Sequence, residues 1–157
     1  VLGDVGWYCV AATLWAFGGE LPERVVATER RELGVDVSLS ALLEFDGGRS
    51  ASFQCGFDAV WRKWFEVAGT SGSIVCDDFV NPWDPAKARF WVHDQQGQAT
   101  SQHFPHCVQE IRMVEVLCDL IRAGRLDDRW PEISLATQRV CDALAEPARE
   151  QRFVTLQ

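Results

Sequence analysis

The sequence predicts an α/β (α+β) protein in which a mostly antiparallel sheet of about six strands carries helices on one face. Three observations support this fold class. The stretches 35–45 and 50–58 alternate apolar and polar residues with a period of two, which is typical of half-buried strands. Asp46-Gly47-Gly48 between them predicts a tight hairpin. The stretches 5–17, 108–123 and 135–145 predict helices.

Length, composition and charge narrow the class of protein. The 157 residues suffice for a single domain, expected to span 1–157, and 47% hydrophobic with 24% charged residues is typical of a soluble globular protein. The net charge of −8 argues against a nucleic-acid partner. No apolar run approaches the roughly 18 residues of a membrane-spanning helix. No basic segment precedes residues 5–17, so a signal peptide is not predicted.

The cysteines and histidines predict neither a disulfide framework nor a metal site. Six cysteines occur without any CxxC pair, mostly within apolar patterns where a free thiol acts as a small hydrophobe. We therefore expect free cysteines and a reducing compartment, the cytoplasm (cytosol) or the plastid stroma. His103, His106 and Cys107 match no standard ligand spacing, so no metal is expected there.

The first half of the chain predicts one helix and three strands. Residues 5–17 are apolar nearly all round, which predicts a buried helix. Pro22 prevents its continuation, and 24–31 predicts a strand. The strands at 35–45 and 50–58 are expected to be antiparallel neighbours with one face in the core. The expected core residues are Val35, Val37, Leu39, Ala41, Leu43, Phe45, Ala51, Phe53, Cys55 and Phe57.

The second half predicts further strands and two helices. Residues 60–68 are expected to add a third strand to the meander, followed by a turn at 69–72 and strands at 74–76, 88–93 and 98–104. Helix 108–123 carries an apolar stripe that includes Met113, Leu117 and Ile121. Ser134 is the expected N-cap of helix 135–145, and 151–156 is the expected last strand.

Two polar groups of residues are candidates for chemistry. Asp4 and Tyr8 are four residues apart, so they share one face of a helix within an otherwise apolar segment. Either Asp4 caps the helix and Tyr8 is a core aromatic, or the pair serves a function. The loop 77–83 carries carboxylates, Asn81 and Trp83, which suit a polyol or sugar. The alternative is a solvated turn with one buried aromatic.

The beginning of the chain resembles a known family. Gly3-Asp4-Val5-Gly6-Trp7-Tyr8 is similar to the Gly-Asp-x-Gly-x-(Tyr or His) signature that opens the C-terminal domain of the Gfo/Idh/MocA oxidoreductases. Further similar segments follow in the family's order at 17–25, 69–74 and 130–138. The most similar branch includes dihydrodiol dehydrogenases, NADP-dependent xylose dehydrogenases and plant-type relatives. The resemblance implies a fold like that of dihydrodipicolinate reductase.

The resemblance also implies a site shared with a second domain. Family members carry a Rossmann domain before this one, so the chain is expected to be the C-terminal portion of a longer protein. No G-x-G-x-x-G occurs here, and NADP or NAD is expected to bind mainly to that N-terminal domain. The resemblance implies that Tyr8 is the general acid/base, aided by a lysine of the other domain, and that Asp4 orients the substrate or that lysine. Trp7, Asn81 and Trp83 are the expected substrate contacts.

One departure and one alternative remain. The family often has a polar residue one turn beyond the Tyr or His, where this chain has Ala11-Ala12-Thr13, which leaves the substrate contacts open. The sheet face with Ser38, Ser40, Ser50, Ser52 and Gln54 is either solvated or, as the resemblance implies, a homodimer interface. The expected function is hydride transfer between nicotinamide and a sugar, polyol or dihydrodiol. The alternative is a non-catalytic interaction module or accessory subunit of a larger assembly on the same fold.

Overall fold

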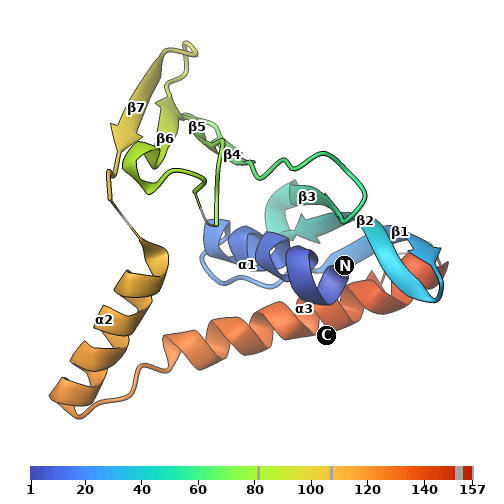
Figure 1. Ribbon diagram of the computed structural model, residues 1–157. Helices are drawn as coiled ribbons and strands as arrows, with labels where there is room; N and C mark the ends of the chain where they lie inside the picture. Colours follow the sequence, from blue (N-terminus) through green and yellow to red (C-terminus); the bar gives the residue numbers. More distant parts are fainter. Residues whose placement is uncertain (81, 107, 151–153, 157) are drawn as a thin grey trace. The chain divides into compact units, whose positions relative to one another are not determined.

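The computed structural model describes residues 1–80, 82–106, 108–150 and 154–156 (Figure 1). The chain forms two compact units, one of residues 1–59 with 128–157 and the other of residues 60–127. Within the described residues each unit holds a four-stranded antiparallel sheet. The antiparallel α/β class is confirmed, but the strands lie in two sheets instead of one sheet of about six.

The first unit joins a four-stranded sheet to two helices. A π-helical turn, η1 (Leu2–Gly6), leads directly into helix α1 (Trp7–Ala16). The strands are β1 (Arg24–Glu32), β2 (Val35–Phe45), β3 (Arg49–Gly56) and the short β8 (Val154–Thr155), in the order β3-β2-β1-β8. Helix α3 (Arg129–Glu150) completes the unit.

The period-two pattern is confirmed in β2 and β3, but Val35 and Phe57 at its two ends are each 56% exposed and do not belong to the core. These strands pair antiparallel from Ser38 opposite Gly56 to Phe45 opposite Arg49. The turn between them, η2 (Asp46–Gly48), has Gly47 at φ 70° and Gly48 at φ 73°. Such angles are costly for residues with a Cβ, so the two glycines permit the tight hairpin.

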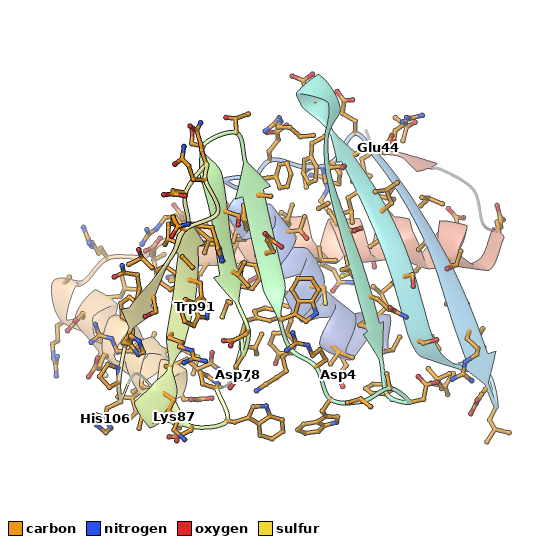
Figure 2. All side chains as sticks on the ribbon, turned by 90° about the horizontal axis from the view of Figure 1, so that it is seen from above. Asp4, Glu44, Asp78, Lys87, Trp91 and His106 are labelled. Carbon is orange, nitrogen blue, oxygen red and sulfur yellow. The ribbon has the colours of Figure 1, made fainter. Side chains whose placement is uncertain are left out.

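The core of the first unit lies between its sheet and its helices. In Figure 2, α1 and α3 cover the same face of the sheet. The fully buried residues of this core come from both layers: Val10, Leu14, Val25, Leu39, Leu43, Val140 and Leu144. The prediction that the first helix is buried all round is wrong, because only Val10 and Leu14 of α1 are buried. The opposite side of α1 does not face the sheet, and Trp15 there is 60% exposed.

The last helix begins earlier than the sequence pattern predicted. Helix α3 starts at Arg129, so Ser134 lies inside it and is not its N-cap. Pro131 occupies the first turn, where its missing N–H removes no helical hydrogen bond. The N–H of Glu132 donates to the Asp128 carbonyl at 3.0 Å. Of the expected strand 151–156, residues 151–153 lie outside the described residues, and β8 pairs with Arg24 and Val25.

The second unit is a meander followed by a helix. Its strands are β4 (Phe65–Gly69), β5 (Gly72–Cys76), β6 (Arg89–His93) and β7 (Ala99–His103), each paired with the next. A short 3-10 turn, η3 (Pro85–Lys87), precedes β6, and helix α2 (Gln109–Ala123) follows β7. The predicted strands at 74–76, 88–93 and 98–104 and the helix at 108–123 are confirmed to within about two residues.

One prediction for the second unit is wrong. The strand predicted at 60–68 begins only at Phe65 and pairs with β5, so it does not extend the β2–β3 meander. Val60 and Trp61 are 91% and 76% exposed, so this stretch has no buried face to fix it as a strand. The apolar stripe of α2 is exposed as well, with Met113 and Ile121 at 67% and 69%. None of the helices formed by the described residues has the length and apolar character that a membrane crossing requires.

Candidate active site

The half-buried carboxylate of Asp36 on strand β2 holds the turn η1 in place. Oδ2 of Asp36 accepts a hydrogen bond from the N–H of Leu2 at 2.7 Å and one from the nitrogen of Val1 at 2.5 Å. Within the turn, the N–H of Gly6 donates to the Val1 carbonyl at 3.1 Å. The position of Asp4 is therefore fixed through its backbone by contacts to the sheet.

Gly6 allows η1 to approach strand β3 closely. A Cβ at this position would lie 3.1 Å from Cδ1 of Leu2 and 3.4 Å from Sγ of Cys55. The first of these distances is shorter than an ordinary van der Waals contact, so with a larger residue the Leu2 side chain would have to shift by a few tenths of an ångström. The small residue thus lets Leu2 and Cys55 pack closely against the turn that precedes Tyr8.

Asp4 and Tyr8 are both accessible to a ligand. Asp4 is exposed (Figure 2). Tyr8 is 46% exposed, so it is not a core aromatic. The N-caps of η1 and α1 are Val1 and Gly6, so Asp4 caps neither helix. The interpretation that Asp4 caps the helix and Tyr8 is a core aromatic is therefore wrong. The catalytic role of the pair stays a prediction.

The residues that flank Tyr8 pack inward. Trp7 is half-buried and packs against the core of the first unit. The thiol of Cys9 interacts with that of Cys55 on β3, and this hydrogen bond lowers the pKa of Cys9 and raises the pKa of Cys55. Burial raises the pKa of Cys141 on α3 to about 11. Cys9, which follows Tyr8 on α1, and Cys55 therefore form a pair of contacting thiols whose pKa values are shifted in opposite directions.

A second cluster of candidate residues lies within the second unit, around Trp83. Oδ2 of Asp78 accepts a hydrogen bond from the N–H of Trp83 at 2.7 Å, and Oδ1 lies 2.9 Å from Nζ of Lys63. The indole rings of Trp83 and Trp61 are 4.9 Å apart. Trp83 is 64% exposed, which contradicts the interpretation of one buried aromatic. Asn81 lies outside the described residues.

Sequence reasoning missed Trp61 and Lys63 as partners of Trp83. Both stand in the run Trp61-Arg62-Lys63-Trp64, which was assigned to a strand because of its apolar residues. Two basic residues between two tryptophans in that run were a usable signal, since cations tend to pack on exposed indole rings. Arg62 and Lys63 do so, at 5.8 Å from the Trp64 ring and 4.5 Å from the Trp83 ring.

Neither a metal centre nor a dinucleotide cradle is formed by the described part of the chain. It contains no group of three or more His, Cys, Asp or Glu side chains that could hold a metal ion. Nε2 of His103 is instead 3.0 Å from Oγ of Ser101, and Cys107 lies outside the described residues. No strand-to-helix connection among the described residues contains a glycine. The glycine-rich turn that usually holds the pyrophosphate of NAD(P) is therefore absent from these connections.

Comparison with known proteins connects the first unit to one family. Residues 1–75 match the GFO/IDH/MocA C-terminal domain. This chain carries a GFO/IDH/MocA C-terminal domain. The matched residues include η1, α1 and the strands up to β5, so Asp4 and Tyr8 lie inside the match. The family resemblance drawn from the opening residues is confirmed.

Relatives of this GFO/IDH/MocA chain are oxidoreductases. It is 30% identical over 155 residues to D-xylose 1-dehydrogenase (NADP(+)) 2 of Haloferax volcanii, covering 98% of the chain and 47% of that protein. It is 36% identical over 86 residues to human trans-1,2-dihydrobenzene-1,2-diol dehydrogenase, and this match covers 54% of the chain and 25% of that protein. The 3-ketoreductase KijD10 of Actinomadura kijaniata, solved with NADP and TDP-benzene, superposes on the chain with a TM-score of 0.79 at 26% identity. This match covers 93% of the chain and 45% of KijD10. The chain thus spans less than half the length of each.

Proposed function

We propose that this chain is the C-terminal part of an NAD(P)-dependent oxidoreductase that transfers a hydride between nicotinamide and a sugar, polyol or dihydrodiol. The names of the relatives supply the substrate classes, since they include a xylose dehydrogenase, a dihydrodiol dehydrogenase and a ketoreductase. The observation that carries the proposal is the accessible Tyr8 at the start of α1, following Asp4 within the matched segment.

The chemistry assigned to this chain is proton transfer. During oxidation, the deprotonated Tyr8 (the phenolate) takes the proton of the substrate hydroxyl and becomes the neutral phenol, and during reduction the phenol returns that proton to the substrate oxygen. An ordinary tyrosine has a pKa of about 10, so this transfer at neutral pH needs a nearby cation. A lysine of the partner domain would supply that charge. Asp4, as an exposed carboxylate on the preceding turn, orients the substrate hydroxyl or that lysine.

Binding of NADP or NAD belongs to the proposed N-terminal Rossmann domain. The described residues of this chain offer no glycine-rich cradle for the pyrophosphate. When bound, the cofactor supplies the hydride acceptor or donor. This chain then contributes the substrate-side groups, with Asp4 and Tyr8 for proton transfer and with Trp7, Asn81 and Trp83 as the proposed substrate contacts.

The proposed assembly is a homodimer formed through the open face of the first sheet. Thr28, Ser40, Ser52 and Gln54 are exposed on adjacent strands of that face, where small polar side chains permit close packing of a second sheet. Sedimentation of the full-length protein tests this assembly. We expect a dimer, and a monomer for Ser52→Arg with an unchanged circular dichroism spectrum. A monomeric wild type, or a variant that stays dimeric, would contradict it.

The free thiols support a reducing compartment, cytoplasm or plastid stroma, as the proposed location. Among the described cysteines, Cys9, Cys55, Cys76, Cys118 and Cys141 are all free. Localisation of the tagged full-length protein in cells is the direct measurement. A secreted protein would contradict the proposal.

A substrate screen tests the proposed reaction. The full-length protein is incubated with NADP⁺ or NAD⁺ and a panel of neutral aldoses, polyols and trans-dihydrodiols. We expect reduction of one cofactor with at least one of these substrate classes, followed by the absorbance of reduced nicotinamide. A protein that binds neither cofactor and turns over no member of the panel would instead be a non-catalytic module.

A further inference from the structure

Trp83 in the second unit is held by a single ion pair that contacts both its backbone and its ring. The carboxylate of Asp78 accepts the N–H of Trp83 through one oxygen at 2.7 Å and meets the Lys63 ammonium through the other at 2.9 Å. The same ammonium lies 4.5 Å from the centroid of the Trp83 ring. Lys63 and Asp78 therefore restrict both the path of the chain and the orientation of the indole.

The loop that carries Asp78 is bonded to the segment that carries Lys63. The N–H of Phe79 donates to the Lys63 carbonyl at 3.0 Å. The rings of Phe79 and Phe65 meet edge to face at 5.1 Å. Backbone and side-chain contacts thus connect the two segments independently of the ion pair. Figure 2 shows Asp78 at one end of the sheet of this unit.

Val80, two residues after Asp78, has an unfavourable backbone conformation. Val80 has φ 69°, in the left-handed region that a β-branched residue rarely adopts. Such a conformation costs about 1–3 kcal/mol and persists where surrounding contacts impose it, often at ligand-binding sites. Val80 directly follows Asp78 and Phe79, whose contacts with Lys63 and Phe65 fix this part of the chain.

The result of these contacts is an exposed aromatic surface with a polar edge. The rings of Trp61 and Trp83 are tilted by 35° at a separation of 4.9 Å, and they are 76% and 64% exposed. Indole faces pack against the C–H faces of a sugar or diol ring, while neighbouring charged groups hydrogen bond its hydroxyls. Because Asp78 offsets the charge of Lys63, the surface suits a neutral ligand.

We propose that Lys63 and Asp78 are positioning residues that fix Trp83, with Trp61 beside it, as a stacking platform for the neutral ring of the substrate. This inference rests on the proposed function and extends it. Lys63 acts through Trp83 and does not transfer a proton or hydride. Its loss should weaken substrate binding and leave the chemical step unchanged.

Steady-state kinetics of the full-length protein test the platform, with the best neutral substrate from the screen. We expect Trp83→Ala to raise KM about tenfold and Lys63→Met to raise it about threefold, with kcat within about twofold of wild type. Lys63→Arg keeps the cation over the ring and should restore KM to within about twofold. Lys87→Met is the matched control, because Lys87 pairs with Asp84 at 3.2 Å at an 82% exposed position.

Two results separate this inference from the proposed function. If the wild type turns over substrate and Lys63→Met behaves like Lys87→Met, the platform is refuted and the function stands. If the wild type turns over no substrate, sugar-dependent quenching of tryptophan fluorescence in the same protein decides the platform. The platform is supported if the wild type shows quenching and both Trp83→Ala and Lys63→Met abolish it. It is overturned if the wild type shows no quenching, or if the two variants are quenched as strongly as the wild type. Near-ultraviolet circular dichroism of each variant verifies folding.

Discussion

The backbone N–H of Leu2 donates a 2.7 Å hydrogen bond to Oδ2 of Asp36 on strand β2. The nitrogen of Val1 donates to the same oxygen. Burial alone would raise the pKa of Asp36, but in the 157-residue chain the hydrogen bonds from Val1 and Leu2, together with the positive charge of the Val1 amine, outweigh it and hold the pKa below its ordinary value. A charged side chain of the sheet thereby holds the turn from which Asp4 projects.

Replacing Asp36 with asparagine should destabilise the first unit in a pH-dependent way. The amide is a weaker acceptor for the two donors, so we expect a loss of about 1 kcal/mol in the free energy of unfolding at neutral pH. Because the folded pKa is lowered, the carboxylate's contribution is complete above the unfolded pKa of about 4 and disappears as the pH falls through the lower folded value. Urea unfolding of wild type and Asp36→Asn at neutral and acidic pH measures the loss of stability and its dependence on pH.

The difference between wild type and Asp36→Asn should therefore shrink in acid. Asp46→Asn is a suitable control, since Asp46 lies in the exposed hairpin turn. A difference that stays constant across this pH range would mean that the Asp36 charge does not stabilise the fold.

Gly72 should be irreplaceable in the second unit. It has φ 149°, and a Cβ there would lie 2.1 Å from the carbonyl oxygen of His93. Gly72→Ala must separate β5 from β6, and we expect a loss of about 1–3 kcal/mol. Hydrogen exchange at the amides of the paired residues Ser73 and His93 reports this loss directly.

Gly97→Ala provides the comparison for Gly72→Ala. Gly97 also has a positive φ, 78°, but no atom lies within 4 Å of a Cβ built there. The backbone penalty alone should be smaller and confined to the β6–β7 turn. Equal effects of the two substitutions on β5–β6 exchange would show that the contact with His93 is unimportant.

Sequence pattern predicted the elements that have one buried face and failed where apolar residues are exposed. In β2, Leu39, Leu43 and Phe45 are buried in the alternation expected of them. Val60, Trp61 and Trp64 are apolar too, but their side chains are largely exposed and the stretch they belong to is not a strand. Periodicity indicates elements that bury one face, so it does not predict the structure of a segment whose apolar side chains are exposed.

The candidate site was predictable in part for the same reason. Asp4 and Tyr8 are near in sequence, so their spacing on a helix was sufficient to select them. The contacts of Trp83 with Trp61 and Lys63 join segments about twenty residues apart, and local spacing does not report such pairings. The division of the strands between two sheets likewise depends on pairing, which alternation does not specify.

The thiols of Cys9 and Cys55 should differ in reactivity although they contact each other. The hydrogen bond between them lowers the pKa of Cys9 and raises that of Cys55. In the folded protein we expect an alkylating reagent to modify Cys9 before Cys55, since the thiolate is the reactive form. Mass spectrometry across a pH series gives the order. Cys55→Ala should move the Cys9 profile to higher pH; earlier modification of Cys55, or an unmoved profile, would contradict the assignment.

The proposed general acid/base is Tyr8, and Tyr8→Phe in the full-length protein isolates its hydroxyl. The ring and its packing remain, so the free energy of unfolding should change by no more than about 1 kcal/mol. Asp4→Asn, which keeps the shape and removes the charge, should give a milder loss of turnover. Trp15→Phe, at a 60% exposed position of the same helix, is the control and should retain activity.

The turnover number of Tyr8→Phe with cofactor and the best substrate is the most direct test of the proposed function. If the Tyr8 hydroxyl transfers the proton, turnover falls by about 10²- to 10⁴-fold while the protein stays folded. Turnover within about threefold of wild type, far less than the loss of a general acid/base causes, would show that Tyr8 is not the proton-transfer group.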